Sequence, residues 1–200
     1  MITRLVLASS NAGKLREFRR LLTPLGLDVV AQAELGIAEA DEPHPTFIEN
    51  ALAKARHASI ASDRPALADD SGICVAALGG APGVRSARYG GEPKSDARNN
   101  AALIAALRGV ADRRAHYYCV LVLLHRGDDP QPIIAEGIWH GTVVDDPRGS
   151  GGFGYDPHFE DVETRLTGAE LPLARKNAIS HRGQAMRSLI ARLRAERRYQ

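Results

Sequence analysis

Strand-like and helix-like hydrophobic patterns alternate along this chain, and that alternation restricts it to the α/β class of folds. The first strand–helix unit is predicted near the N-terminus. Thr3 to Ala8 forms a short apolar run typical of a buried strand, and apolar residues then recur at helical spacing until Gly26 ends the helix. The residues with this spacing are Leu15, Phe18, Leu22 and Leu25.

The same alternation continues towards the C-terminus. Thr46 and Glu49 have the spacing of a capping box, which predicts a helix to about Ser62. The further predicted elements are a strand that ends at Asp69-Asp70, an apolar stretch from Ile73 to Leu78, a loop from Gly79 to Pro93, a helix from Ser95 to Arg108, a strand from His116 to His125, one or two strands within Ile133 to Val144, and a helix from Ser180 to about Arg198.

The composition indicates one domain, residues 1–200, or two lobes that share a sheet without a separate linker. The chain has 200 residues, 44% of them hydrophobic, and such a length buries roughly 70% of the unfolded surface. No repeat, low-complexity linker or change in composition marks a second domain.

Charge and cysteine content bound the partners and the compartment. The 26 Lys and Arg residues nearly balance the 24 Asp and Glu residues, so nothing global favours a nucleic-acid or membrane partner. Cys74 and Cys119 lack CxxC spacing and are predicted to pack in the core of a protein from a reducing cytoplasm. The apolar run from Cys119 to Leu124 is far shorter than the ~18 residues of a membrane span, so we expect a soluble protein.

Two adjacent acids, Asp69 and Asp70, are the first candidate for chemistry. They follow the apolar Ala66 to Ala68 and precede Ser71-Gly72, where the strand is predicted to run out into a turn. A carboxylate held at a strand end and open to solvent can ligate Mg²⁺ or take a proton from water. A merely polar turn is the alternative.

A polar segment between the first strand and the first helix is a candidate phosphate loop. Amides at a helix N-terminus bind anions, and Ser, Asn and Lys add donors and a positive charge. An ordinary helix cap is the alternative. The segment is Ser9, Ser10, Asn11, Ala12, Gly13 and Lys14, and it lacks the spacing of a Walker A loop.

The run from Gly149 to Gly154 matches GxGxxG formally, but Pro157 follows closely and disfavours the helix that a dinucleotide site requires. What remains is a glycine-rich loop that carries Phe153, with the acid Asp156 just after it. Such a loop can approach a ligand closely, and the ring offers a stacking face for a base. Phe153 as a core anchor is the alternative.

Three further groups are candidates for ligand contacts. Ser180 is a credible N-cap that places His181 and Arg182 in a first helical turn, where cations are unfavourable without a compensating partner. With Lys176 they could read a base carbonyl and meet phosphate, or they could be surface charge, as Arg187, Arg192, Arg194, Arg197 and Arg198 are expected to be. Glu42 is a candidate metal ligand and Lys54 a candidate phosphate contact.

Taken together, these motifs resemble those of the inosine/xanthosine triphosphate pyrophosphatase family, in order and over nearly the whole chain. The matching segments are Ser9-Ser10-Asn11-x-x-Lys14, Thr46 to Ala51, Ala68 to Gly72, Gly79 to Val84 with Ser86 to Tyr89, Gly151 to Pro157, and Ser180 to Ala185. The resemblance implies an elongated α/β fold with a mixed sheet and flanking helices, and two lobes with the active site in the cleft between them. It also implies a cytoplasmic, Mg²⁺-dependent homodimer that converts ITP, dITP and XTP to the monophosphate and pyrophosphate.

The resemblance implies a role for each matching residue. Ser9 to Lys14 and Lys54 would bind the triphosphate, Asp70 would be the general base and a metal ligand, and Glu42 would help to hold Mg²⁺. The residues implied to contact the rest of the substrate are Ser71, Phe153, Gly154, Tyr155, Asp156, Lys176, His181 and Arg182, of which His181 and Arg182 would read the base.

Two other classes of function stay open at this stage. A non-catalytic module that senses purine nucleotides would keep the phosphate loop and the base pocket, but it has no need of Asp70 or Glu42. An RNA-binding protein that uses the basic C-terminal helix is disfavoured by the balanced charge and by an aromatic content of 5%.

Overall fold

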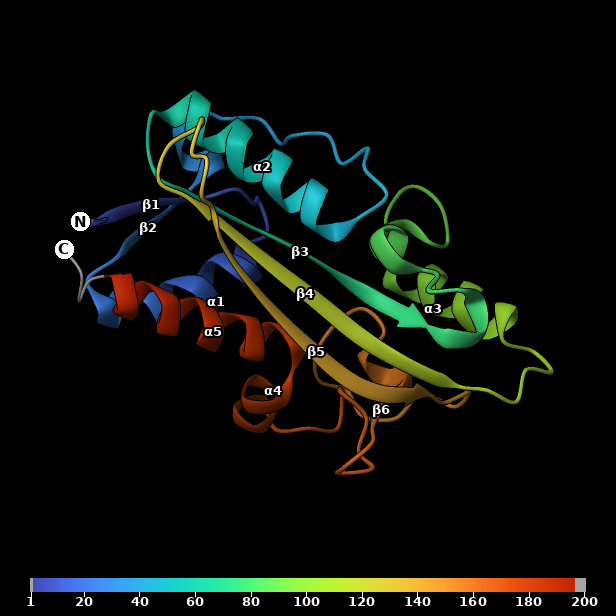
Figure 1. Cartoon of the computed structure of the whole chain (residues 1–200). Coiled ribbons are helices and arrows are strands. Elements are labelled where there is room, and N and C mark those ends of the chain that lie inside the picture. Colours follow the sequence, from blue (N-terminus) through green and yellow to red (C-terminus); the bar gives the residue numbers. More distant parts are fainter. Residues whose placement is uncertain (1, 197–200) are drawn as a thin grey trace. The chain divides into compact units, whose positions relative to one another are not determined.

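The computed structural model describes residues 2–196 and places a six-stranded mixed sheet with flanking helices within them (Figure 1). The α/β prediction is confirmed. The strands are β1 (Arg4–Leu7), β2 (Asp28–Ala31), β3 (Ala66–Val75), β4 (Arg114–Leu124), β5 (Ile133–Val143) and β6 (Phe159–Asp161), in the spatial order β2-β1-β3-β4-β5-β6. The helices are α1 (Ala12–Leu22), α2 (Phe47–Ser62), α3 (Asp96–Ala106), α4 (Leu173–Ile179) and α5 (His181–Glu196).

The sheet is parallel at one edge and antiparallel at the other. β1 pairs in parallel with β2 and with β3, whereas β5 and β6 are antiparallel. The chain divides into two compact units. The first holds residues 2–70, 120–135 and 186–196, and the second holds Ser71–Cys119 and Glu136–Ala185. A cleft between two lobes stays a prediction.

In the first unit, helices pack on the parallel strands. Leu5, Val6 and Leu7 of β1 are fully buried, as is Phe18 of α1. α2 begins at the predicted cap, where the Thr46 hydroxyl accepts the Glu49 amide, and it buries a stripe of alanines. Side chains this small let α2 lie close to β1, which it contacts.

The second unit has a core of its own, with an aromatic centre. Tyr117, Trp139 and Phe159 meet there, with ring centroids 4.7 to 6.0 Å apart. α3 closes this core with Leu103, and Leu107 follows the helix. The core therefore supports strand and helix segments that carry candidate site residues.

Two predicted boundaries are wrong, and one predicted loop contains helical structure. α1 ends at Leu22, before Gly26, because Pro24 lacks the amide that another helical turn needs, and the turn Thr23–Leu25 is 3₁₀ instead. β3 does not end at Asp69-Asp70 but continues to Val75. The Gly79 to Pro93 loop contains a 3₁₀ segment, Gly83–Arg88.

Other differences concern what the sequence patterns left out. Two short strands, β2 and β6, and the short helix α4 were not predicted, because each is below the length at which periodicity is readable. Of the two cysteines, Cys119 is buried in the core as predicted, whereas Cys74 is only half-buried. The predicted end of the last helix at Arg198, together with Arg197, lies outside the described residues.

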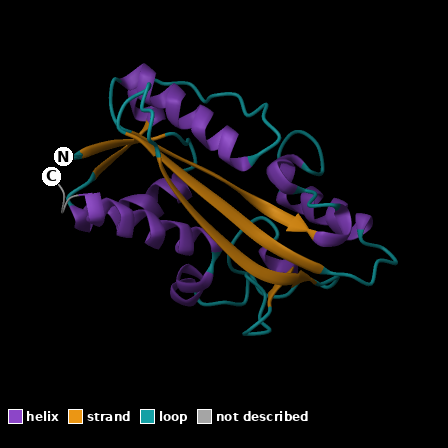
Figure 2. Cartoon of the chain, in the orientation of Figure 1, coloured by secondary structure: helices purple, strands orange, loops and turns teal. Residues whose placement is uncertain are grey.

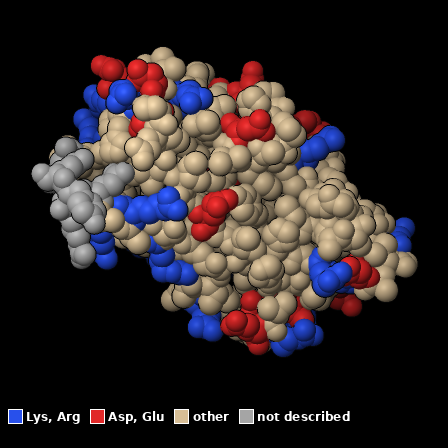
Figure 3. Space-filling model, viewed as in Figure 1, with Lys and Arg blue, Asp and Glu red and all other residues tan. Residues whose placement is uncertain are grey.

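Surface features follow the composition. On the face shown in Figure 3, Lys and Arg side chains lie among Asp and Glu side chains, as the near balance of charge predicts. Arg187, Arg192 and Arg194 of α5 are exposed, as expected. None of the helices within residues 2–196 is both long enough and apolar enough to cross a membrane.

Candidate functional site

The candidate residues fall into two groups, one in each unit. The first group, which we call the acid–lysine cluster, consists of Lys14, Glu42, Lys54, Asp69 and Asp70. The second group, the base-side cluster, consists of Phe153, Asp156, Lys176, His181 and Arg182.

Asp69 and Asp70 are interior residues of β3, not turn residues. Asp69 is 1% exposed and Asp70 is 9% exposed, so the expectation of carboxylates open to solvent is wrong. Buried carboxylates require cationic or hydrogen-bonding partners. Each of the two carboxylates forms an ion pair with a lysine. Lys14 Nζ lies 2.9 Å from Asp69 Oδ1, and Lys54 Nζ lies 3.6 Å from Asp70 Oδ1.

Lys54 joins Asp70 to Glu42. Its ammonium donates a hydrogen bond to Glu42 Oε1, and Glu42 lies in the loop of residues 36–46 that leads into α2 (Figure 2). Burial by itself lowers the pKa of Lys54, but attraction by the surrounding carboxylates, Asp70 first, outweighs it and raises the pKa above its usual value. Lys54 is therefore a fixed positive charge.

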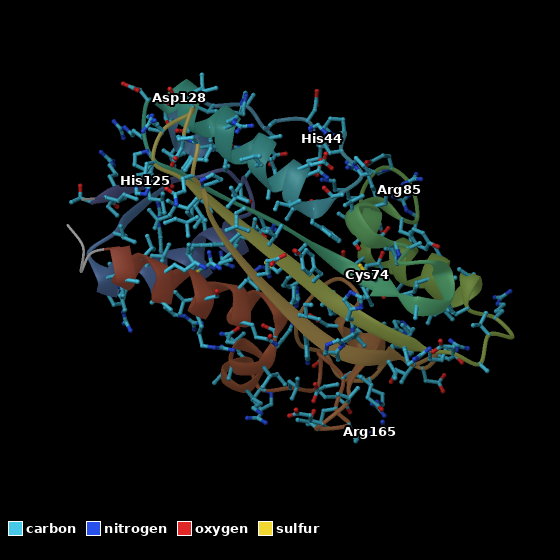
Figure 4. All side chains as sticks on the ribbon, viewed as in Figure 1. His44, Cys74, Arg85, His125, Asp128 and Arg165 are labelled. Atoms are coloured by element: carbon cyan, nitrogen blue, oxygen red, sulfur yellow. The ribbon has the colours of Figure 1, made fainter. Side chains whose placement is uncertain are left out.

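The loop before α2 is held by the side chain of Asn50, in the first turns of that helix. Asn50 is buried, and its amide accepts the His44 backbone amide at 3.0 Å and donates to the His44 carbonyl at 3.1 Å. His44 lies in this loop (Figure 4). Because Lys54 follows Asn50 by one helical turn, the same helix face holds both the loop and the ammonium.

The pKa of Asp70 is raised to about 6. Burial is the main cause, Lys54 opposes it, and the neighbouring Glu42 and Asp69 add to it. A carboxylate with a pKa close to neutral is a stronger base than an ordinary aspartate and is still ionised at pH 7 to 8. Asp70 thus has the properties of a general base.

The candidate phosphate loop is also a helix cap. Asn11 Oδ1 accepts the amides of Gly13 at 2.8 Å and Lys14 at 3.1 Å, and Ser9 Oγ accepts the Asn11 amide. The anion that compensates Lys14 in the first turn of α1 is Asp69 of the chain itself. The backbone amides of Asn11, Gly13 and Lys14 therefore already donate to side chains of the same segment, whereas Ser10 is exposed.

The acid–lysine cluster contains two carboxylates suited to a hard cation. Throughout residues 2–196, no group of three or more His, Cys, Asp or Glu side chains is arranged to hold a metal ion. Mg²⁺, however, is usually held by one or two carboxylates, with water and substrate phosphates as the other ligands. Asp70 and Glu42, which both approach Lys54, fit that donor set.

In the base-side cluster, Phe153 lies on the surface of the glycine-rich loop. Its ring is 63% exposed, so the alternative of a core anchor is wrong. Lys176 Nζ lies 5.1 Å and the Arg182 guanidinium carbon 5.8 Å from the ring centroid. The ring therefore combines an open face with nearby positive charge, a combination suited to a purine base.

The buried side chain of Asp156 holds the glycine-rich loop in place through a hydrogen bond and an ion pair. It is 3% exposed, accepts the Phe153 amide at 2.7 Å and forms an ion pair with Lys176. Gly152, at φ +73°, leaves room for this pair, because a Cβ there would overlap the Asp156 carboxylate. Tyr155 instead faces the core, where its hydroxyl donates to the Ser86 carbonyl at 2.7 Å.

His181 and Arg182 are buried at the start of α5, so they are not surface charge. Ser180 caps the helix by accepting the Gly183 amide, as predicted. The His181 ring stacks on Tyr117, with centroids 4.6 Å apart and planes 7° from parallel. Arg182 Nη2 donates to Ser71 Oγ at 3.2 Å, so the predicted substrate contact Ser71 also lies beside this cluster.

Sequence reasoning missed three contributors to the base-side cluster. Tyr117 looked like an ordinary strand residue, and its contact with His181 depends on the fold. Asp96 and Asn100 of α3 hold the Gly154 peptide, with hydrogen bonds of 2.7 and 2.8 Å. Their i, i+4 spacing on a predicted helix was the readable signal, but nothing in the sequence pointed to the loop as their partner.

Comparisons with known proteins place the chain in a family. The family model described as the Ham1 family matches residues 5–192. Among curated proteins, the chain is 66% identical to the dITP/XTP pyrophosphatase of Ralstonia nicotianae over 194 residues, covering 96% of each chain. It is 62% identical to the dITP/XTP pyrophosphatase of Nitrosomonas europaea over 192 residues, covering 96% of this chain and 95% of that one.

The fold agrees with a solved structure as well. The structure of a HAM1 protein from Coxiella burnetii superimposes with a TM-score of 0.93 at 44% identity, covering 98% of this chain and 100% of that one. The family model, the curated relatives and the structural match all extend over nearly the full length. This chain therefore belongs to the Ham1 family.

Proposed function

We propose that the protein hydrolyses nonstandard purine nucleoside triphosphates, namely ITP, dITP and XTP, to the nucleoside monophosphate and pyrophosphate. Such a reaction would remove these nucleotides from the pool used for nucleic acid synthesis. Relatives 58 to 66% identical that are named dITP/XTP pyrophosphatase support the substrate class. The observation in this chain that carries the proposal is Asp70, a buried carboxylate beside a lysine, with a pKa of about 6.

In this proposal, Asp70 orients and deprotonates the water that attacks the phosphorus next to the leaving pyrophosphate. Its raised pKa makes it a competent base at neutral pH. Lys54 and Lys14 supply positive charge that neutralises the triphosphate as charge develops on the leaving group. Ser9, Ser10, Asn11 and the rest of the segment to Lys14 supply neutral donors for the phosphate oxygens.

A magnesium ion is part of the proposal, with Asp70 and Glu42 as the residues that would hold it. When bound, Mg²⁺ supplies charge stabilisation on the phosphate oxygens and lowers the pKa of coordinated water. Lys54, already between the two carboxylates, would keep them oriented. Asp69 is not included among the metal ligands, because its carboxylate is almost fully buried and pairs with Lys14.

The base-side cluster accounts for the preference for particular bases. A purine would stack on Phe153, and His181 or Arg182 would donate a hydrogen bond to the oxygen at position 6 of the base. Adenine carries an amino group at that position, so buried donors would face a donor. A mismatch of this kind can be worth ~10⁴ in discrimination.

The non-catalytic alternative lacks a specific observation in its favour. A sensing module needs the stacking ring and the donors to the nucleobase, but it needs no buried general base with a raised pKa.

We also propose that the enzyme works in the cytoplasm and as a homodimer. Sedimentation equilibrium of the purified chain tests the second point, and a monomer at micromolar concentration would contradict it.

The decisive assay is pyrophosphate release. The purified chain should release pyrophosphate from dITP and XTP in the presence of Mg²⁺, with little release from dATP and little from any substrate in excess EDTA. Asp70→Asn is the matched negative control, since it keeps the shape of the side chain. Orthophosphate in place of pyrophosphate, or equal rates on dITP and dATP, would contradict the proposal.

A further inference from the structure

We infer that Asp96 and Asn100 of α3 are positioning residues that hold the glycine-rich loop so that Phe153 presents a fixed stacking face to the purine base. The inference rests on the proposed function, since it assigns these residues to the base side of that same site. We refer to the two side chains and the Gly154 peptide groups that they hold as the α3 clamp.

The α3 clamp binds both backbone polar groups of Gly154, its amide and its carbonyl. The Gly154 amide donates to Asp96 Oδ2 at 2.7 Å, and Asn100 Nδ2 donates to the Gly154 carbonyl at 2.8 Å. The two side chains lie one helical turn apart on α3, at the spacing that places them on the same face. Gly154 adopts a left-handed conformation, φ +62°, which favours glycine at this point of the loop.

A second anchor acts on the other side of Phe153. The Phe153 amide donates to the buried Asp156 at 2.7 Å, so the peptide units before and after the Phe153 Cα both donate to a carboxylate. Fixing both peptides fixes the direction in which the side chain leaves the backbone. The exposed Phe153 ring is thereby held from its backbone, without burial in a core.

The helix that carries the clamp is itself well anchored. Leu103 packs in the core of the second unit. The buried Asn99 accepts the Gly90 amide at 2.7 Å and donates to the Ala87 carbonyl at 3.0 Å, which fixes the segment before α3. Asp96 also lies in the first turn of α3, where the helix dipole stabilises its negative charge.

The purpose of such a clamp is preorganisation. A ligand that must order a loop when it binds loses affinity to that ordering, and a loop held in advance avoids the loss. The clamp touches the backbone of the loop rather than the ligand. Its effect should therefore be the same for every stacked base and absent for a ligand without a base.

The test uses Asp96→Ala, Asn100→Ala and the double variant in the full chain. Each single change should raise KM for dITP on the order of tenfold, the effect of losing a hydrogen bond to a backbone group, with kcat within about twofold. The same increase should appear with XTP. Inhibition by inorganic triphosphate, which has no base to stack, should be unchanged.

Two control variants separate the clamp from helix stability. Asp96→Asn keeps an oxygen acceptor in the same position and should restore KM to within about threefold of the unmodified chain. Ser95→Ala removes the N-cap of α3, where Ser95 Oγ accepts the Arg98 amide, and should lower the melting temperature without raising KM.

The outcomes distinguish this inference from the proposed function. An unmodified chain that releases no pyrophosphate from dITP would overturn the proposed function, and with it the role of the clamp in substrate binding. An active chain whose double variant keeps its KM, or whose affinity for inorganic triphosphate falls equally, would overturn the clamp alone. Faster hydrogen exchange at the Gly154 amide in Asp96→Ala is expected and is measured without substrate, and an unchanged exchange rate would also overturn it.

Discussion

Replacing Asp70 by asparagine should make the protein more stable at neutral pH, at the cost of activity. The pKa of Asp70 rises from 3.8 to about 6 on folding, mainly through burial, so the folded state disfavours the ionised form. Asparagine resembles the neutral form in size. The substitution therefore removes a charge that the fold carries at a cost, and it does so without opening a cavity.

The size of the gain follows from the shift. About two pKa units at 1.36 kcal/mol each give ~3 kcal/mol in the limit of full ionisation. Because the folded pKa lies above the unfolded one, the favourable contribution of the protonated carboxyl is complete below about pH 4 and is lost as the pH rises through about 6. The advantage of Asp70→Asn should thus grow between these values and stay constant above them.

Urea denaturation of both proteins from pH 4.5 to 8, in EDTA and without nucleotide, measures this difference. Asp112→Asn is a control of opposite sign, because the hydrogen bond from Arg114 lowers the pKa of the half-buried Asp112 to about 2 and so makes its ionised form favourable. A stability gain for Asp70→Asn that is independent of pH, or a loss at pH 7.5, would refute the assignment of a costly buried charge to Asp70.

Three other outcomes concern the substrate. Asp70→Asn should keep nucleotide binding, measured by calorimetry, while turnover on dITP falls by roughly 10² to 10⁴, and near-normal turnover would move the general base elsewhere. Lys14→Ala should weaken inhibition by inorganic triphosphate and barely change the ratio of kcat/KM for dITP and dATP, because its partner is common to all nucleotides; a changed ratio would contradict a phosphate role. Arg182→Ala should lower kcat/KM on dITP and XTP far more than on dATP, whereas an equal loss on all three would leave His181 as the reader of the base.

The sequence identified the residues of the acid–lysine cluster but not their burial within a continuing strand. Asp-Asp-Ser-Gly is typical of a turn, yet β3 continues through it, because two lysines from α1 and α2 reach the carboxylates and make their burial tolerable. Local propensity contains no information on such distant partners. Asn11 was readable as a cap and as a phosphate ligand, and the structure shows the cap.

In the base-side cluster, the sequence revealed the residues that we propose to contact the base and missed those that hold them in place. Phe153, Lys176 and Arg182 stand in unusual motifs, which are visible without a structure. Asp96 and Asn100 lie on an ordinary polar helix face, and their hydrogen bonds are made to a loop more than 50 positions away in the chain. For supporting contacts of this kind, the sequence shows at most a shared helix face, here through i, i+4 spacing, and does not show which segment they bind, since any short polar residue at the right place in the fold can provide them.

The aromatic centre of the second unit has an optical consequence. Trp139 is the only tryptophan in the chain, its ring lies 6.4 Å from that of His181, and its indole nitrogen donates to the buried Asp161 at 2.7 Å. Fluorescence of the unlabelled protein therefore originates beside His181, and it gives a signal for ligand binding near this residue in real time.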